Sequence, residues 1–133
     1  MATPPAGPQL EIEGLLRLLL ADQGTTADLV QAIESTREAM WASYSEGTGV
    51  VREYLNGEGP FPQRAHLFAL LVKFGSDFAE TVLDWCDLAE AEIRSWPQVA
   101  DVGLTDSARQ HMEAQVRSYE RRAERRPGNQ RAR

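Results

Sequence analysis

Residues 63–97 read QRAHLFALLVKFGSDFAETVLDWCDLAEAEIRSWP, and this stretch decides the fold. Its apolar residues recur in steps of three and four, the spacing that keeps side chains on one side of an α-helix. They are Leu71, Phe74, Phe78, Val82, Trp85, Ala89, Ile93 and Trp96. The spacing predicts one long helix over residues 63–96, which ends before Pro97 and whose apolar side needs partner helices.

The residues before this stretch predict two more helices. Leucines at helical spacing over residues 10–20, followed by Gly24, indicate a short first helix. Apolar residues over 28–55 indicate a second helix, which Thr25 or Thr26 caps and in which two glycines, Gly47 and Gly49, produce a kink or a break. Residues 56–62, NGEGPFP, predict the turn that leads into the long helix.

A fourth helix is expected after the long one. Thr105 is suited to cap it, an apolar stripe runs through Met112 and Val116, and Pro127 with Gly128 stops it. No alternating run of β-branched residues indicates a strand. The sequence therefore predicts an all-α, single-domain bundle of about four helices with one long central helix.

The domain organisation follows from composition. With 133 residues, the chain has room for one domain. We expect residues 1–9 to be a proline-rich linker or disordered arm, residues 10–126 to be the helical domain, and residues 127–133 to be a basic, disordered tail. The sequence has no signal-peptide pattern and no apolar run of membrane-spanning length, and its single cysteine allows no internal disulfide. These features favour a cytoplasmic protein with no membrane contact.

Charge is divided unequally along the chain. The net charge is −6, but the last 17 residues hold seven arginines against two glutamates, a net charge of +5, which leaves −11 on residues 1–116. An acidic body repels a phosphate backbone, so only the C-terminal end is suited to contact nucleic acid. The weak candidates for that contact are Arg121, Arg122, Arg125 and Arg126. The alternative is a solvated helix end whose arginines favour the helix dipole.

Nothing in the sequence indicates catalysis. Asp77, Glu80, Asp84 and Asp87 fall on one side of the long helix, but no Glu-x-x-His pair accompanies them, so a solvated acidic face is favoured over a metal or acid–base site. Cys86 is interpreted as a small buried apolar residue rather than a nucleophile. We therefore expect no enzyme activity, no catalytic residue, no metal and no cofactor.

The apolar residues of the long helix predict association. They exceed what short neighbouring helices can cover, so a homodimer is expected. The candidate interface is Leu71, Phe74, Phe78, Val82, Trp85, Ala89 and Ile93. Core or interface packing is the favoured use of the aromatic residues, and the alternative is a slot for a planar hydrophobic small molecule that they line. The candidate ligand-binding residues are Trp85, Trp96, Phe78 and Trp41.

Two stretches of the chain resemble a known family. LEIEGLLRLLLADQGTTADLVQAIE, residues 10–34, and EYLNGEGPFPQRAHLFALLVKFGSDFAETVLDWCDLAEAEIRSWP, residues 53–97, resemble the C-terminal half of PadR-like transcriptional regulators, especially those of high-GC actinobacteria. The pieces GPFPQR and WCDLAEAEIRSWP are the most distinctive. Thirteen arginines against one lysine fit such a source.

The resemblance implies an effector and dimerisation half whose DNA-reading winged helix would precede it, with some relatives binding planar compounds against interface tryptophans. Only residues 1–9 precede the resembling part, so we expect this chain to contact DNA specifically only if a winged helix is supplied elsewhere. Two alternatives stay open: the ligand-binding half of a TetR-like regulator and a helical protein–protein interaction module.

Overall fold

The computed structural model describes residues 24–128, and this part of the chain is helical, with no strand. It holds three α-helices: α2 (Thr26–Leu55), α3 (Ala65–Ser95) and α4 (Asp106–Glu124), with a short 3-10 turn, η1 (Pro62–Arg64), before α3. The all-α prediction is confirmed. The predicted first helix over residues 10–20, the arm over 1–9 and the end of the tail lie outside the described residues.

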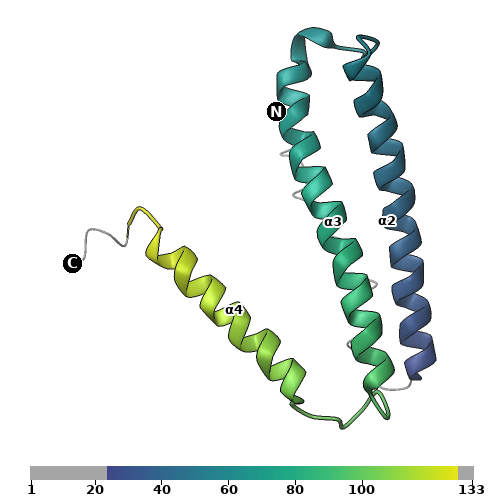
Figure 1. Ribbon diagram of the computed structural model, residues 1–133, viewed down its shortest axis with the longest axis vertical. Coiled ribbons are helices and arrows are strands. Elements are labelled where there is room, and N and C mark those ends of the chain that lie inside the picture. The colour runs from purple at the N-terminus through teal and green to yellow at the C-terminus, as the bar shows by residue number, and fades with distance from the viewer. Residues whose placement is uncertain (1–23, 129–133) are drawn as a thin grey trace, which may run out of the picture. The chain divides into compact units, whose positions relative to one another are not determined.

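Helices α2 and α3 lie side by side in opposite directions and form a long hairpin (Figure 1). Thr25 starts α2 as predicted, because its hydroxyl accepts a hydrogen bond from the Asp28 amide at 3.1 Å while the Asp28 carboxylate accepts one from the Thr25 amide at 3.0 Å. The expected break at Gly47 and Gly49 does not occur, since α2 continues through both residues. The tertiary contact with α3 overrides the low helix propensity of glycine.

The turn between the two helices is built from the residues that the sequence marked. Asn56 caps the end of α2, Gly57 adopts a positive φ of 79°, and Pro62 occupies the first position of η1. Behind the turn, the rings of Tyr54 and Phe68 stack with their centroids 4.5 Å apart. This stack joins the last turn of α2 to the first turn of α3.

The core of the hairpin is small and lies at its open end. It consists of Leu29, Ile33, Cys86, Ala89 and Ile93, with Val30, Val82, Trp96 and Val99 partly buried against them. Cys86 is fully buried, as predicted, and burial raises the pKa of its thiol. Trp96 ends α3 in an extended conformation, which is the conformation that the following Pro97 requires.

The chain divides into two compact units, one ending at Ala100 and the other beginning at Asp101. The second unit contains α4, which begins at the predicted cap: the Thr105 hydroxyl accepts a hydrogen bond from the Ala108 amide at 3.1 Å. None of the α4 residues is buried within its own unit. The apolar stripe of α4, which includes Met112, Val116 and Tyr119, is exposed.

Candidate functional site: the apolar side of the hairpin

Helix α3 has two apolar faces. The first packs against α2 and includes Ala79, Cys86, Ala89 and Ile93, which are buried. The second is rotated by about 80° around the helix axis, as 100° per residue gives, and is not covered by α2. We call it the outer face of α3; it comprises Leu67, Leu71, Phe74, Phe78 and Trp85.

The outer face is accessible to solvent along most of its length. Leu71 is 70% exposed, Phe74 is 58% exposed and Trp85 is 39% exposed. Phe74 and Phe78 stack with their ring centroids 6.3 Å apart. Leu70 and Leu88, at the margin of the face, are exposed as well. Large apolar side chains gathered in one exposed strip mark an interaction surface.

The structure divides the predicted interface residues between these two faces. Leu71, Phe74, Phe78 and Trp85 belong to the outer face, whereas Ala89 and Ile93 are buried in the core and Val82 packs against it. A single stripe in the sequence therefore contributes to two surfaces. Only the outer-face residues are placed to contact a second molecule.

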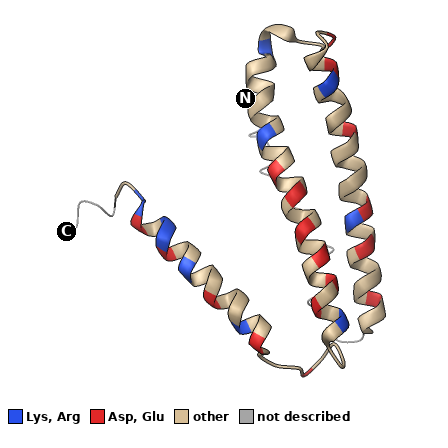
Figure 2. Ribbon diagram, in the orientation of Figure 1, with Lys and Arg blue, Asp and Glu red and all other residues tan. Residues whose placement is uncertain are grey.

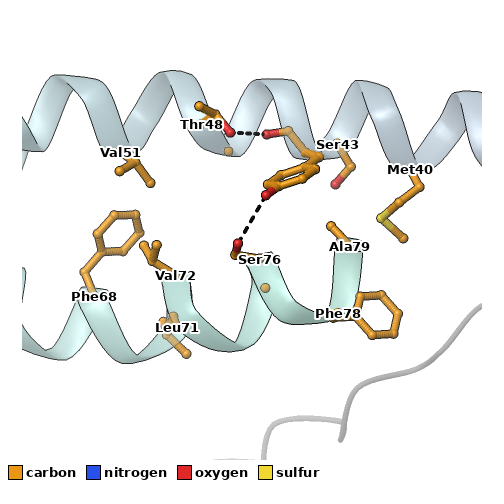
Figure 3. A pocket seen from close by; sticks show the side chains of 13 residues that line it. Met40, Ser43, Thr48, Val51, Phe68, Leu71, Val72, Ser76, Phe78 and Ala79 are labelled. Carbon is orange, nitrogen blue, oxygen red and sulfur yellow. Dashed lines mark hydrogen bonds between the residues drawn. The ribbon is translucent and has the colours of Figure 1, made fainter. Parts of the chain in front are cut away.

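Between the two helices lies a groove with a cavity volume of about 460 Å³ (Figure 3). Phe68, Leu71, Val72 and Phe78 line it from α3, and Met40, Tyr44 and Val51 from α2. The groove exists because small residues occupy the positions where the helices would otherwise interdigitate: Ser43, Gly47, Gly75, Ser76 and Ala79. A Cβ added at Gly47 or Gly75 would meet no atom within 4 Å, so neither glycine is required by close packing.

One side of the groove carries polar groups. The hydroxyls of Tyr44 and Ser76 share a hydrogen bond of 3.2 Å, and the Tyr44 hydroxyl also donates to the Glu80 carboxylate at 3.4 Å. The Thr48 hydroxyl donates to the Tyr44 carbonyl at 2.7 Å (Figure 3). The lining is therefore apolar with a few hydroxyls, which suits an uncharged, mostly apolar occupant.

The four candidate ligand-binding residues do not converge on this groove. Phe78 lines it. Trp41 is 58% exposed and stacks on Tyr44, with ring centroids 6.1 Å apart, while Trp85 lies on the outer face and Trp96 packs against the core. Nothing in the sequence identified Ser43, Gly47, Gly75 and Ser76 as groove residues, because small residues reveal a groove only when the register of the two helices is known.

The acidic side of α3 serves to hold the hairpin together. Arg37 of α2 lies between Asp87, at 3.2 Å, and Glu90, at 2.8 Å, and it also pairs with Glu34. Hydrogen bonds from Arg94 and from Arg37 lower the pKa of the Glu90 carboxyl. Asp77 pairs with Lys73 at 2.8 Å. Of the predicted acidic stripe, Asp87 therefore pairs with α2 and Asp77 pairs within α3. The pairs of Arg37 with Asp87 and Glu90 help to set the register of α2 against α3.

Two further features of residues 24–128 bear on function. No three of their His, Cys, Asp and Glu side chains gather closely enough to hold a metal ion. No helix among these residues has the length and apolar character needed to cross a membrane.

The arginines near the chain end lie on α4 and just after it. Arg121 contacts Ser118 of its own helix at 3.1 Å, and the Arg125 guanidinium donates to the Arg121 carbonyl at 3.4 Å. They are exposed, which is compatible with both a solvated helix end and contact with a phosphate backbone.

Comparison of the chain with protein-family models, with curated proteins and with solved structures gives no match.

Proposed function

We propose that this chain is a helical association domain that forms a homodimer through the outer face of α3. The observation that carries the proposal is the exposure of Leu71, Phe74 and Trp85 on one side of a helix whose other apolar side is already occupied by α2. Exposed leucine and aromatic side chains in a continuous strip are costly to hydrate, and a second copy removes them from water.

The setting of this association is transcriptional regulation. Support for it comes from the resemblance of residues 10–34 and 53–97 to the effector half of PadR-like regulators. In that setting the domain would bring together two DNA-reading winged helices supplied from outside residues 10–97, and the protein would act in the cytoplasm without enzyme activity. A TetR-like effector half and a plain interaction module would use the same exposed face. They differ from this proposal in which further domain, if any, is joined to the helical domain.

Sedimentation equilibrium tests the association. We expect a dimer at tens of micromolar for the parent chain and a monomer for Leu71→Glu, because the variant places a charge in the middle of the outer face. Ala69→Glu is the matched control: Ala69 is an exposed residue on another side of α3, and its variant should remain a dimer. A monomeric parent chain at these concentrations would refute the proposal.

The regulatory setting has its own test. A reading frame that continues upstream of the Met1 codon and encodes a winged helix would support it. DNA footprinting with the longer product and with the present chain should then show a defined operator for the longer product only. Sequence-specific footprinting by the present chain alone would contradict the assignment of DNA reading to a separate winged helix.

A second proposed role is the sensing of a planar hydrophobic small molecule, favoured by the groove between α2 and α3. A planar aromatic compound in the groove should quench tryptophan fluorescence saturably, because Trp41 stacks on the groove residue Tyr44. Phe78→Ala, which removes a ring from the groove lining, should weaken that binding more than it weakens the fold. Unchanged fluorescence and an unchanged melting temperature across a panel of such compounds would remove this role and leave dimerisation intact.

A further inference from the structure

The groove and the outer face of α3 form one continuous surface. Leu71 and Phe78 belong to both, since they line the groove and lie on the outer face. The exposed apolar side chains of this surface amount to roughly 500–600 Å² in each copy; they are Leu71 and Phe78 together with Leu67, Leu70, Phe74, Trp85 and Leu88. A standard protein–protein interface buries about 800 Å² per partner. The area is therefore close to what a stable dimer needs.

The spacing of the apolar residues suits an antiparallel pairing of two α3 helices. Leu71 and Trp85 are each seven residues from Phe78. A two-fold axis at Phe78 would therefore place Leu71 of one copy opposite Trp85 of the other. The same spacing would also allow a parallel pairing, in which each residue meets its own copy.

The charge distribution of α3 selects between these two pairings. Residues 80–95 hold five carboxylates against Arg94, a net charge of −4, whereas Lys73 and Asp77 cancel in residues 65–79. Figure 2 shows the acidic residues gathered along the half of α3 near its C-terminal end. A parallel pairing would set the two acidic halves beside each other, while an antiparallel pairing sets each acidic half beside a neutral one.

We propose that α3 of a second copy of this chain packs antiparallel on the outer face, with a two-fold axis near Phe78. In this arrangement the Trp85 side chain of each copy lies beside Leu71 of the other copy and closes its groove. This inference rests on the proposed function, because it names the geometry of the same association. It makes the groove a composite site, bounded by α2 and α3 of one copy and by Trp85 of the other.

Distances between spin labels on α3 test the orientation. The variants Thr81→Cys and Ala91→Cys, each in a Cys86→Ala background, place one nitroxide per chain at an exposed position. The antiparallel dimer predicts a distance of about 40 Å or more for Ala91 and a distance below about 25 Å for Thr81, since the two sites lie thirteen and three residues from the axis. A parallel dimer predicts similar distances, below about 30 Å, for both sites.

The outcomes separate the two proposals. Similar short distances at both sites would overturn the antiparallel seating and leave the homodimer standing, whereas the absence of dipolar coupling in both variants would overturn the homodimer as well. Circular dichroism and sedimentation check that the background folds and associates as the parent does. If Cys86→Ala fails that check, the labels are introduced into the parent, whose Cys86 is fully buried.

Two separate tryptophan substitutions give an independent test. Trp85→Ala should weaken dimerisation at least about thirty-fold, because a buried tryptophan at an interface is commonly worth 2 kcal/mol or more. Trp41→Ala is the matched control, since Trp41 is even more exposed but lies on α2 and outside the groove. Its dissociation constant should change less than about three-fold. Equal effects of the two substitutions would overturn the role assigned to Trp85.

Discussion

Gly59 lies where the turn between α2 and α3 passes over an aromatic ring. A Cβ at this position would overlap the ring of Tyr54, which is held in place by its stack on Phe68. The sequence identified residues 56–62 as a turn but assigned no particular role to Gly59. Its requirement for glycine comes from a contact that only the folded hairpin makes.

Gly59→Ala should therefore destabilise the chain by about 1–3 kcal/mol, the usual cost of inserting a methyl group into a filled space. Gly49→Ala is the control: it lies within α2 with nothing near its Cβ position, and the substitution should stabilise the helix by about 0.5–1 kcal/mol. Urea unfolding followed by circular dichroism measures both. Equal stability of the two variants would contradict this account of Gly59.

Glu90 makes the hairpin sensitive to acid. Its pKa in the folded chain lies below the ordinary value near 4.5, because Arg94 and Arg37 donate hydrogen bonds to its carboxylate. A group with a lowered pKa stabilises the folded state above its ordinary pKa, and this contribution is lost as the pH falls through the folded-state value. Protonation of Glu90 therefore favours the unfolded chain.

Melting temperatures measured between pH 7 and pH 3 should fall more steeply for the parent than for Glu90→Gln, which has no carboxyl to protonate. Glu38→Gln, a change at an exposed position of α2, should keep the pH dependence of the parent. If Glu90→Gln and the parent lose stability in parallel below pH 4.5, the Arg37–Glu90 contact does not contribute to the acid sensitivity of the fold.

At the scale of the element, α2 and α4 show how differently two predicted helices behave. Both begin at a threonine cap, but α2 buries Leu29 and Ile33 against α3, whereas α4 buries none of its residues within its own unit. Helix α4 carries four arginines, and Arg125 and Arg126 follow directly after it. Its exposed cations remain the weak candidate for contact with nucleic acid.

We expect α4 to confer at most weak, non-specific DNA binding that disappears at moderate salt, because such binding depends on the release of counterions from phosphates. Truncation after Tyr119 removes Arg121, Arg122, Arg125 and Arg126 and should abolish it. Electrophoretic mobility shifts at 50 and 200 mM salt measure the effect. Retention that persists in the truncated chain would show that the arginines are not responsible.

At the scale of the whole molecule, few side chains are buried in the part of the chain that the structure describes. In residues 24–128 only Leu29, Ile33, Ala79, Cys86, Ala89 and Ile93 are buried hydrophobic residues, while many larger ones are exposed. Hydrophobic burial is the main favourable contribution to folding. The hairpin should therefore gain a substantial part of its stability from association.

The melting temperature of the parent should rise with protein concentration, because association stabilises the folded state by mass action. Calorimetry from about ten to several hundred micromolar should show this rise, whereas Leu71→Glu should melt at a lower temperature that does not depend on concentration. A parent chain whose melting temperature is constant over this range would argue against stabilisation by a second copy.

Several features were determined by the sequence alone, because their causes are local. The caps at Thr25 and Thr105, the turn over residues 56–62, the long helix up to Pro97 and the absence of strands in residues 24–128 all depend on hydrogen bonds, backbone preferences and helical periodicity within a few residues. Gly47 and Gly49 are the exception, since contact with α3 keeps α2 continuous across them.

Only the tertiary structure decided which apolar residues pair within the hairpin and which remain for a partner. Periodicity gave one stripe containing both Phe74 and Ile93, and it could not separate residues buried against α2 from those on the outer face. That separation depends on the register that Arg37 and Tyr44 set across the two helices, as does the alignment of Gly47 with Gly75 that opens the groove. Register is a relation between residues 28 to 53 positions apart, and no local pattern in the chain contains it.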